Sequence, residues 1–208
     1  MRATMPDLCL ENEQRALGFS LIAGVDEAGR GPLAGPVSAA AVILPDSFEH
    51  SVLNDSKQLS EAKREILYEE IMGGSMGVIA WCSATASVEE IEEINILQAT
   101  HLAMRRSVDG LAKAPDMVLI DGRPVKGFPH AHLGVIKGDS KSLSIAAASI
   151  IAKVERDRLM VACAEEFPQY GFEKHKGYGT KQHLEALEKY GPCRLHRKTF
   201  GPVARFTP

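Results

Sequence analysis

Closely spaced cysteine pairs, long hydrophobic runs and internal repeats are missing from this sequence of 208 residues. The four cysteines lie far apart and form no C-x-x-C pair, which argues against both a zinc site and a disulfide framework. We expect reduced thiols, buried as small apolar side chains. These cysteines are Cys9, Cys82, Cys163 and Cys193.

No apolar stretch approaches the roughly 20 residues that a membrane helix needs. The N-terminal stretch MRATMPDLCLENEQRA mixes acidic and polar residues and holds no apolar core of signal-peptide length. We therefore expect a protein without a membrane span, located in the cytoplasm, and a monomer by default.

Charge is distributed unevenly along the chain, although the net charge is only −3. Residues 171–208 contain eight Lys/Arg against three Asp/Glu, whereas the rest of the chain contains 16 basic and 24 acidic residues. An acidic body with a basic C-terminal section is typical of a protein that binds a cation in one place and a polyanion in another. A solvated charged surface without any ligand gives the same counts, so charge alone does not show that the protein binds a cation or a polyanion.

Apolar runs and turn residues predict two strands near the start of the chain, followed by helices that alternate with further strands. The predicted strands cover residues 21–25, 37–44, 76–86, 117–120 and 132–136. The predicted helices cover residues 61–72, 88–108, 140–166 and 181–190, the first two after Ser60 and Ser87 as capping residues. A hairpin followed by alternating helices and strands indicates an α/β fold, a mixed sheet flanked by helices, with a small C-terminal helical segment.

Acidic residues stand at or near the ends of three predicted strands: Asp26-Glu27, Asp121 and Asp139. Functional sites of open α/β sheets form at the carboxyl ends of strands. Carboxylates gathered there repel one another, and a hard divalent cation such as Mg²⁺ relieves the repulsion. Two such ions about 3.5–4 Å apart form a phosphodiester-cleaving site, in which one prepares the attacking water and the other stabilises the leaving oxygen.

Two alternatives apply to these acids. Adjacent strand residues point to opposite faces, so Asp26 and Glu27 can share a site only if the chain bends there, as the following glycines allow. Asp139 precedes a predicted long helix, and helix capping is an alternative role for it.

The stretch Gly29-Arg30-Gly31-Pro32-Leu33-Ala34 fits the dinucleotide fingerprint G-x-G-x-x-G/A, which requires a helix directly after the glycines. Here Gly35-Pro36 and the run VSAAAVIL follow, which favours a second strand. A nicotinamide-dependent oxidoreductase is therefore only the second hypothesis, after the phosphodiester-cleaving site. The backbone N–H groups of the loop and Arg30 suit a sugar-phosphate, while a tight turn without a ligand is the simpler alternative.

Six motifs, in this order and spacing, resemble bacterial ribonuclease HII from about residue 20 to the end of the chain. They are GVDEAGRGPLAGPV, LNDSKQLS, INILQATHLAM, LIDG, IKGDSKSLSIAAASIIAKVERDR and HKGYGTKQH. The resemblance implies a ribonuclease H-like five-stranded mixed sheet as a catalytic domain over residues 1–166. It also implies a basic, helical substrate-binding segment over residues 167–208.

The resemblance implies an endonuclease that hydrolyses the RNA strand of RNA–DNA hybrids. It also implies nicking 5′ of single ribonucleotides embedded in duplex DNA, leaving 3′-hydroxyl and 5′-phosphate ends, and so ribonucleotide removal from DNA. Asp26, Glu27, Asp121 and Asp139 match the family's four acidic residues, which hold two Mg²⁺ or Mn²⁺ ions. Gly29, Arg30 and Gly31 match the loop that reads the ribose 2′-hydroxyl, and Tyr178 matches the tyrosine that stacks at the RNA–DNA junction.

Other polar residues receive less specific predictions. Lys57, Ser140 and Lys141 are candidates for contacts to backbone phosphates. Contact with nucleic acid is one possible role for His183 and His196, but we expect both to be ordinary surface histidines. Arg156 and Arg158, with Glu155 and Asp157, are expected to form local ion pairs on an exposed helix face. A non-catalytic nucleic-acid-binding module built on the basic C-terminal section is a third hypothesis, disfavoured by the acids at strand ends.

Overall fold

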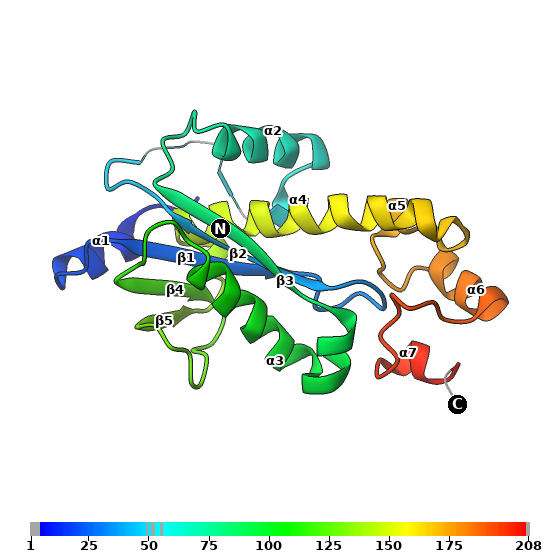
Figure 1. Ribbon diagram of the computed structural model, residues 1–208. Helices are drawn as coiled ribbons and strands as arrows, with labels where there is room; N and C mark the ends of the chain where they lie inside the picture. The colour runs from blue at the N-terminus through cyan, green and yellow to red at the C-terminus, as the bar shows by residue number, and fades with distance from the viewer. Residues whose placement is uncertain (1–4, 49, 51–52, 55, 207–208) are drawn as a thin grey trace.

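A five-stranded mixed sheet with helices on both faces forms the body of the protein (Figure 1). This computed structural model describes residues 5–48, 50, 53–54 and 56–206. The strands are β1 (Ile22–Ala28), β2 (Val37–Ile43), β3 (Ala80–Ala86), β4 (Met117–Asp121) and β5 (His132–Val135), in the order β3-β2-β1-β4-β5. The first three pair antiparallel, whereas β1–β4 and β4–β5 pair parallel, so the predicted mixed sheet is confirmed.

Helix α3 covers one face of the sheet, and helices α2 and α4 cover the other (Figure 1). The bounds of the helices are α1 (Cys9–Ala16), α2 (Glu61–Met72), α3 (Val88–Asp109), α4 (Leu143–Glu166), α5 (Phe172–His175), α6 (Lys181–Tyr190) and α7 (Gly201–Ala204). Ala23 and Val25 of β1 pack on the side of α3, and the alternate residues of β2, Ala40 and Val42, pack against α4 and α2. A Cβ built on Gly24 would lie only 2.2 Å from the Ser144 carbonyl carbon, so this glycine lets α4 approach the sheet.

The predicted helix starts are largely confirmed. Ser60 caps α2 by accepting from the Lys63 N–H, and Ser87 forms a capping box with Glu90 at the start of α3. The uninterrupted helix predicted over 88–108 is wrong at Asn95, which has φ 66° and ψ 164°. The Asn95 carboxamide oxygen accepts from the Leu97 and Gln98 N–H groups, and so caps the second part of α3 after this kink.

The glycine-rich corner leads directly into β2, and therefore lacks the helix that a nicotinamide-binding loop requires. The predicted burial of the cysteines is wrong, because Cys9 is exposed and the other three are partly exposed; all four are free thiols. Within the described residues, no helix has the length and apolar character that crossing a membrane requires.

The N-terminal helix α1 is fixed to the start of α4 by Glu11, although no sequence pattern marks this residue. Its side chain is almost fully buried, with 1% exposed. Oε1 of Glu11 accepts hydrogen bonds from the hydroxyls of Ser142 and Ser144, both at 2.6 Å, and from the Ser144 N–H at 3.0 Å. The carboxylate thus satisfies donors at the N-terminus of α4, where negative charge is favourable.

Glu11→Ala is expected to lower the free energy of unfolding by about 1–3 kcal/mol, because it leaves buried donors of Ser142 and Ser144 without an acceptor. Urea unfolding measures the change. Glu13→Ala, on the exposed side of the same helix, is the matched control and should shift the value by no more than about 0.5 kcal/mol. Equal effects of the two substitutions would contradict the anchoring role.

The C-terminal segment lies beyond the end of α4 and packs on the loop between β1 and β2 (Figure 1). Tyr170, Phe172 and Leu195 form a small core with Ala34 of that loop and Met160 of α4. The segment therefore shares its core with the body, and it brings its own loops next to the Gly29–Gly31 turn.

Candidate active site

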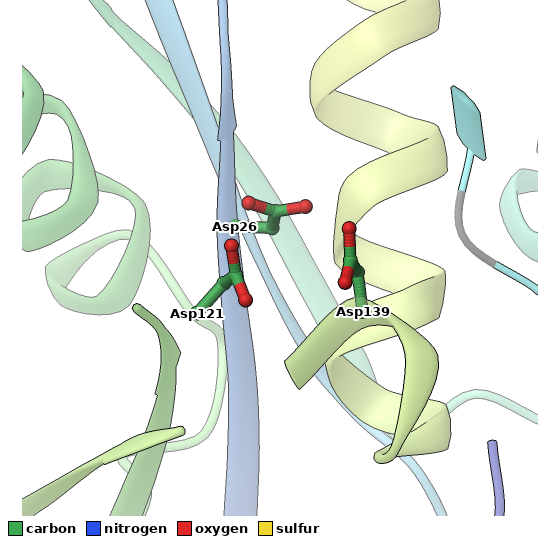
Figure 2. Close-up of side chains that lie close together, drawn as sticks. All are labelled: Asp26, Asp121 and Asp139. Atoms are coloured by element: carbon green, nitrogen blue, oxygen red, sulfur yellow. The ribbon is translucent and has the colours of Figure 1, made fainter. Parts of the chain in front are cut away.

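Three aspartates from separate parts of the chain converge at the edge where β1 and β4 end (Figure 2). One carboxylate oxygen from each of Asp26, Asp121 and Asp139 lies within 4.8 Å of the other two. Parallel pairing of Val25 with Ile120 places Asp26 and Asp121 next to each other. The short 3₁₀ helix 138–140 after β5 carries Asp139, which faces Asp26 across the cluster in Figure 2.

Backbone hydrogen bonds hold the carboxylates of Asp26 and Asp121 in place. The Gly138 N–H donates to Oδ1 of Asp121 at 2.6 Å, which ties the end of β4 to the turn that carries Asp139. Oδ1 of Asp26 accepts from the Glu27 N–H at 2.7 Å. The alternative that Asp139 caps α4 is wrong, since α4 begins at Leu143, rather than at residue 140, and Ser142 is its capping residue.

Neighbouring positive groups do not fully balance the negative charge of the carboxylates in this cluster. Burial raises the pKa of Asp26 well above its ordinary value, and the nearby carboxylates of Glu27 and Asp121 raise it further. Burial also raises the pKa of Asp121, against the opposing effect of the Gly138 N–H. Oδ2 of Asp26 is buried and has no hydrogen-bond partner among the described residues. Closely spaced, under-compensated oxygen donors of this kind fit a hard divalent cation.

Glu27 approaches the cluster from the other side of the sheet. The pairing of β1 with β2 runs in register as far as Ala28 with Ser38, so the chain lacks the bend between Asp26 and Glu27 that was the condition for their sharing one site. Glu27 instead lines a cavity of about 610 Å³ on the α3 side, into which Asp121 also opens. Oε1 of Glu27 accepts from Arg30 Nη1 at 3.2 Å, and burial is the main cause that raises the pKa of this carboxyl.

The structure places the Gly29–Gly31 turn beside the tyrosine of the HKGYGT motif. A Cβ built on Gly31 would lie 3.8 Å from Cε1 of Tyr178. The Tyr178 ring is 44% exposed, and the ammonium of Lys153 lies 5.8 Å from its centroid. The two motifs, about 150 residues apart in sequence, therefore form one surface.

The three predicted phosphate-contacting residues have different surroundings. Lys57 Nζ forms an ion pair with Oδ2 of Asp139 at 3.1 Å, which places it at the carboxylate cluster. The Ser140 hydroxyl donates to the Lys137 carbonyl at 2.9 Å, so its proton is already used in a hydrogen bond within the turn 137–140. Lys141 is exposed at the end of that turn.

Two histidines and an arginine are buried where a surface location was predicted. His183 and His196 are both 0% exposed, so the prediction of ordinary surface histidines is wrong. Arg156 is 1% exposed and donates to backbone carbonyls rather than to acids on its own helix. Arg158 pairs with Glu65 and Glu69 of α2, which also contradicts the local pairs predicted for this helix.

The buried histidines form a hydrogen-bond chain behind Tyr178. His183 Nδ1 donates to the Tyr178 carbonyl at 2.9 Å, so His183 Nε2 accepts from His196 Nε2 at 3.0 Å. His196 Nδ1 then accepts from the Cys193 N–H at 3.0 Å. Each ring thus carries one proton, and a second proton on His183 would break its bond to His196.

Acid is expected to destabilise the C-terminal segment through these histidines. Burial lowers the pKa of both His183 and His196 to about 4 from an ordinary value of 6.5. Their stabilising contribution is therefore complete above pH 6.5 and is lost as the pH falls toward 4. Urea unfolding between pH 7.5 and 4.5 should show this loss, and His196→Asn should make it shallower. An unchanged pH dependence in His196→Asn would contradict the assignment.

Solved structures identify the class of fold. The ribonuclease H2 of Pyrococcus horikoshii OT3 matches with a TM-score of 0.73 and 24% identity, over 90% of this chain and 97% of that chain. Bst-RNase HIII in complex with Mn²⁺ matches with a TM-score of 0.68 and 18% identity, over 89% of this chain and 68% of that chain. The mixed sheet and its flanking helices thus define a ribonuclease H-like fold.

Sequence comparison identifies the family within this class. The family model described as Ribonuclease HII matches residues 23–203. Ribonuclease HII of Bacillus subtilis (strain 168) is 55% identical over 94% of this chain and 75% of that protein. Ribonuclease HII of Neisseria meningitidis (strain Z2491) is 56% identical over 88% of this chain and 93% of that protein. The chain belongs to the ribonuclease HII family and is accordingly a hydrolase with ribonuclease H-type endonuclease activity.

Proposed function

We propose that the protein is a metal-dependent endonuclease that hydrolyses the RNA strand of RNA–DNA hybrids and nicks duplex DNA 5′ of a single embedded ribonucleotide. It leaves 3′-hydroxyl and 5′-phosphate ends, and serves to remove ribonucleotides from DNA in the cytoplasm, as a monomer. The observation that carries this proposal is the cluster of the buried Asp26 and Asp139 with the partly exposed Asp121, in which one Asp26 oxygen lacks a partner among the described residues.

The cluster suits Mg²⁺ or Mn²⁺, because both ions prefer carboxylate oxygens. Asp26, Asp121 and Asp139 supply these oxygens on one side of β1, and Glu27 supplies a fourth carboxylate from the other side for a second ion. Bound divalent ions at such a site activate water and stabilise the leaving oxygen of a phosphodiester. The Mn²⁺ named in the Bst-RNase HIII structure belongs to a protein of the same fold.

The residues around the cluster suit substrate recognition. Gly29, Arg30 and Gly31 form a turn in which Gly29 is buried and Arg30 and Gly31 are exposed, and the backbone N–H groups of this turn read the ribose 2′-hydroxyl. Tyr178 offers an exposed ring for stacking at the junction with DNA. Lys57, Ser140 and Lys141 contact phosphates of the backbone, and the basic segment 167–208 extends this surface next to the catalytic domain 1–166.

A comparison of labelled duplexes in Mg²⁺ or Mn²⁺ tests the proposed substrate class. The RNA strand of an RNA–DNA hybrid should be cut, whereas an all-DNA duplex of the same sequence should remain intact because it has no 2′-hydroxyl. Equal cleavage of both duplexes would contradict recognition of the ribose.

Tyr178→Ala is expected to reduce cleavage at a lone ribonucleotide about tenfold or more, and cleavage of a long hybrid less, because only the first substrate presents a single RNA–DNA junction. The measurement is kcat/KM on both substrates. Tyr178→Phe should keep the selectivity, and Tyr190→Ala, an exposed tyrosine of the same segment, serves as the control. Equal losses on both substrates would show that Tyr178 has no junction-reading role.

A further inference from the structure

Arg197 is a fully buried arginine whose guanidinium donates to the backbone of a single loop. It is 0% exposed and comes from the C-terminal segment. Its five bonds are Nε to the Gly35 carbonyl (2.9 Å), Nη1 to those of Arg30 (3.0 Å) and Pro32 (2.7 Å), and Nη2 to those of Gly29 (2.6 Å) and Pro36 (3.2 Å). A guanidinium has five N–H donors, so every one of them is used on the loop 29–36.

Arg156 of α4 supports the same loop from beside it. Its guanidinium donates to the carbonyls of Ala34 (3.1 Å), Pro36 (3.0 Å) and Lys176 (3.0 Å). Gly29, at φ 94°, packs so closely that a Cβ there would lie 1.9 Å from Nε of Arg156. Among the described residues, neither arginine forms an ion pair with a carboxylate. Two buried positive charges therefore lie under the loop, partnered by carbonyl dipoles.

These bonds fix the direction in which the peptide groups of the loop face. The C=O and N–H of a trans peptide point in opposite directions. Because the carbonyls of Gly29 and Arg30 point inward to Arg197, the N–H groups of Arg30 and Gly31 point away from it. Arg30 and Gly31 are exposed, and their N–H groups have no acceptor among the described residues.

Later N–H groups of the loop are already used within the protein. The Leu33 N–H donates to the Gly177 carbonyl at 2.8 Å, and the Gly35 N–H donates to the Leu195 carbonyl at 2.8 Å. Arg30 and Gly31 are the exposed residues of the loop 29–36, so their adjacent N–H groups are the donors open to a ligand, and Tyr178 lies 3.8 Å from a Cβ built on Gly31.

We propose that Arg197, assisted by Arg156, is the positioning residue for ribose recognition. It holds the peptides after Gly29 and Arg30 so that their N–H groups face the 2′-oxygen of a ribonucleotide, and its buried charge favours an electron-rich acceptor there. This inference rests on the proposed function, since it assumes that the loop 29–31 reads the ribose. Donors fixed before binding cost no reorganisation when the substrate arrives, which makes recognition selective.

Arg197→Lys tests the proposal, because lysine keeps the positive charge but lacks the five-donor planar fork. In a cleavage-deficient Asp121→Asn background, affinity is measured for a duplex with one ribonucleotide and for the same duplex in DNA only. Arg197→Lys should lower the ratio of the two affinities about tenfold, while binding of the DNA duplex changes less than about twofold. Arg194→Lys, at an exposed arginine nearby, is the matched control and should keep the ratio of the parent.

The outcomes separate this inference from the proposed function. If the parent protein, with Asp121→Asn alone, binds both duplexes equally, that result overturns ribose recognition itself. A parent with a clear preference that Arg197→Lys retains, or a loss of affinity equal for both duplexes, would overturn only the positioning role. If Arg197→Lys fails to fold by circular dichroism, Arg156→Lys takes its place, with the same decline of the ratio expected and the same outcomes decisive.

Discussion

Asp121→Asn should reduce cleavage by at least about a thousandfold, which corresponds to about 4 kcal/mol of transition-state stabilisation. The substitution removes one negative charge from the three-carboxylate cluster, and with it a ligand for the proposed ion. It leaves the local structure in place, because the asparagine oxygen can still accept the hydrogen bond that Gly138 donates to Oδ1. Single-turnover cleavage of a hybrid in saturating Mg²⁺ measures the loss.

The control for this prediction is Asp109→Asn, which removes an exposed carboxylate that pairs with His130 at the surface. Its activity should remain near that of the unmodified protein, and both variants should show unchanged circular dichroism. Near-full activity of Asp121→Asn would show that Asp121 has a structural role rather than a role in metal binding.

Asp26→Asn should stabilise the metal-free protein by about 1–3 kcal/mol while it abolishes cleavage. The pKa of Asp26 is raised in the folded state, so folding favours the protonated form. The corresponding stabilisation is present below the unfolded pKa, near 3.8, and is lost as the pH rises through the raised folded value. At pH 8, far above the unfolded pKa, the raised folded pKa of Asp26 therefore opposes folding, and a neutral carboxamide removes this cost together with the repulsion from Glu27 and Asp121.

Urea unfolding at pH 8 with a chelator measures this effect, and the same experiment with Mg²⁺ or Mn²⁺ supplies its control. The unmodified protein should gain stability as the ion concentration rises, because the ion binds the folded state, whereas Asp26→Asn should gain much less. A metal-free Asp26→Asn that is less stable than the unmodified protein would contradict the account of Asp26 as an uncompensated buried charge.

The sequence predicts the sheet and the approach of Asp26 to Asp121, because both follow from local patterns. Apolar runs mark β1 and β4, and parallel neighbours place their carboxyl ends together. The position of Glu27 was not predictable in this way. Strand alternation sends its side chain to the α3 face, and only the structure shows that it lines a cavity there together with Asp121, outside the group of three aspartates.

The buried polar residues could not be found from the sequence. Arg197 and His196 stand in a basic, polar stretch that looks solvated, yet both are fully buried. Their burial depends on contacts with the loop 29–36, which is more than 150 residues away in the chain. The burial of Glu11 could not be predicted for the same reason, since its partners Ser142 and Ser144 lie at the start of α4, far away in the chain. Local propensity carries no information about such pairings.

The measurement that tests the central claim most directly uses one end-labelled DNA duplex with a single ribonucleotide. The protein is added with Mg²⁺, with Mn²⁺, or with a chelator, and the products are mapped to single-nucleotide resolution. The account predicts one nick on the 5′ side of the ribonucleotide, with 3′-hydroxyl and 5′-phosphate ends, in the presence of either ion and none with the chelator. Folded protein that leaves the duplex intact with both ions, or that cuts equally well with the chelator, would contradict the assignment of the carboxylate cluster as a metal-dependent nuclease site.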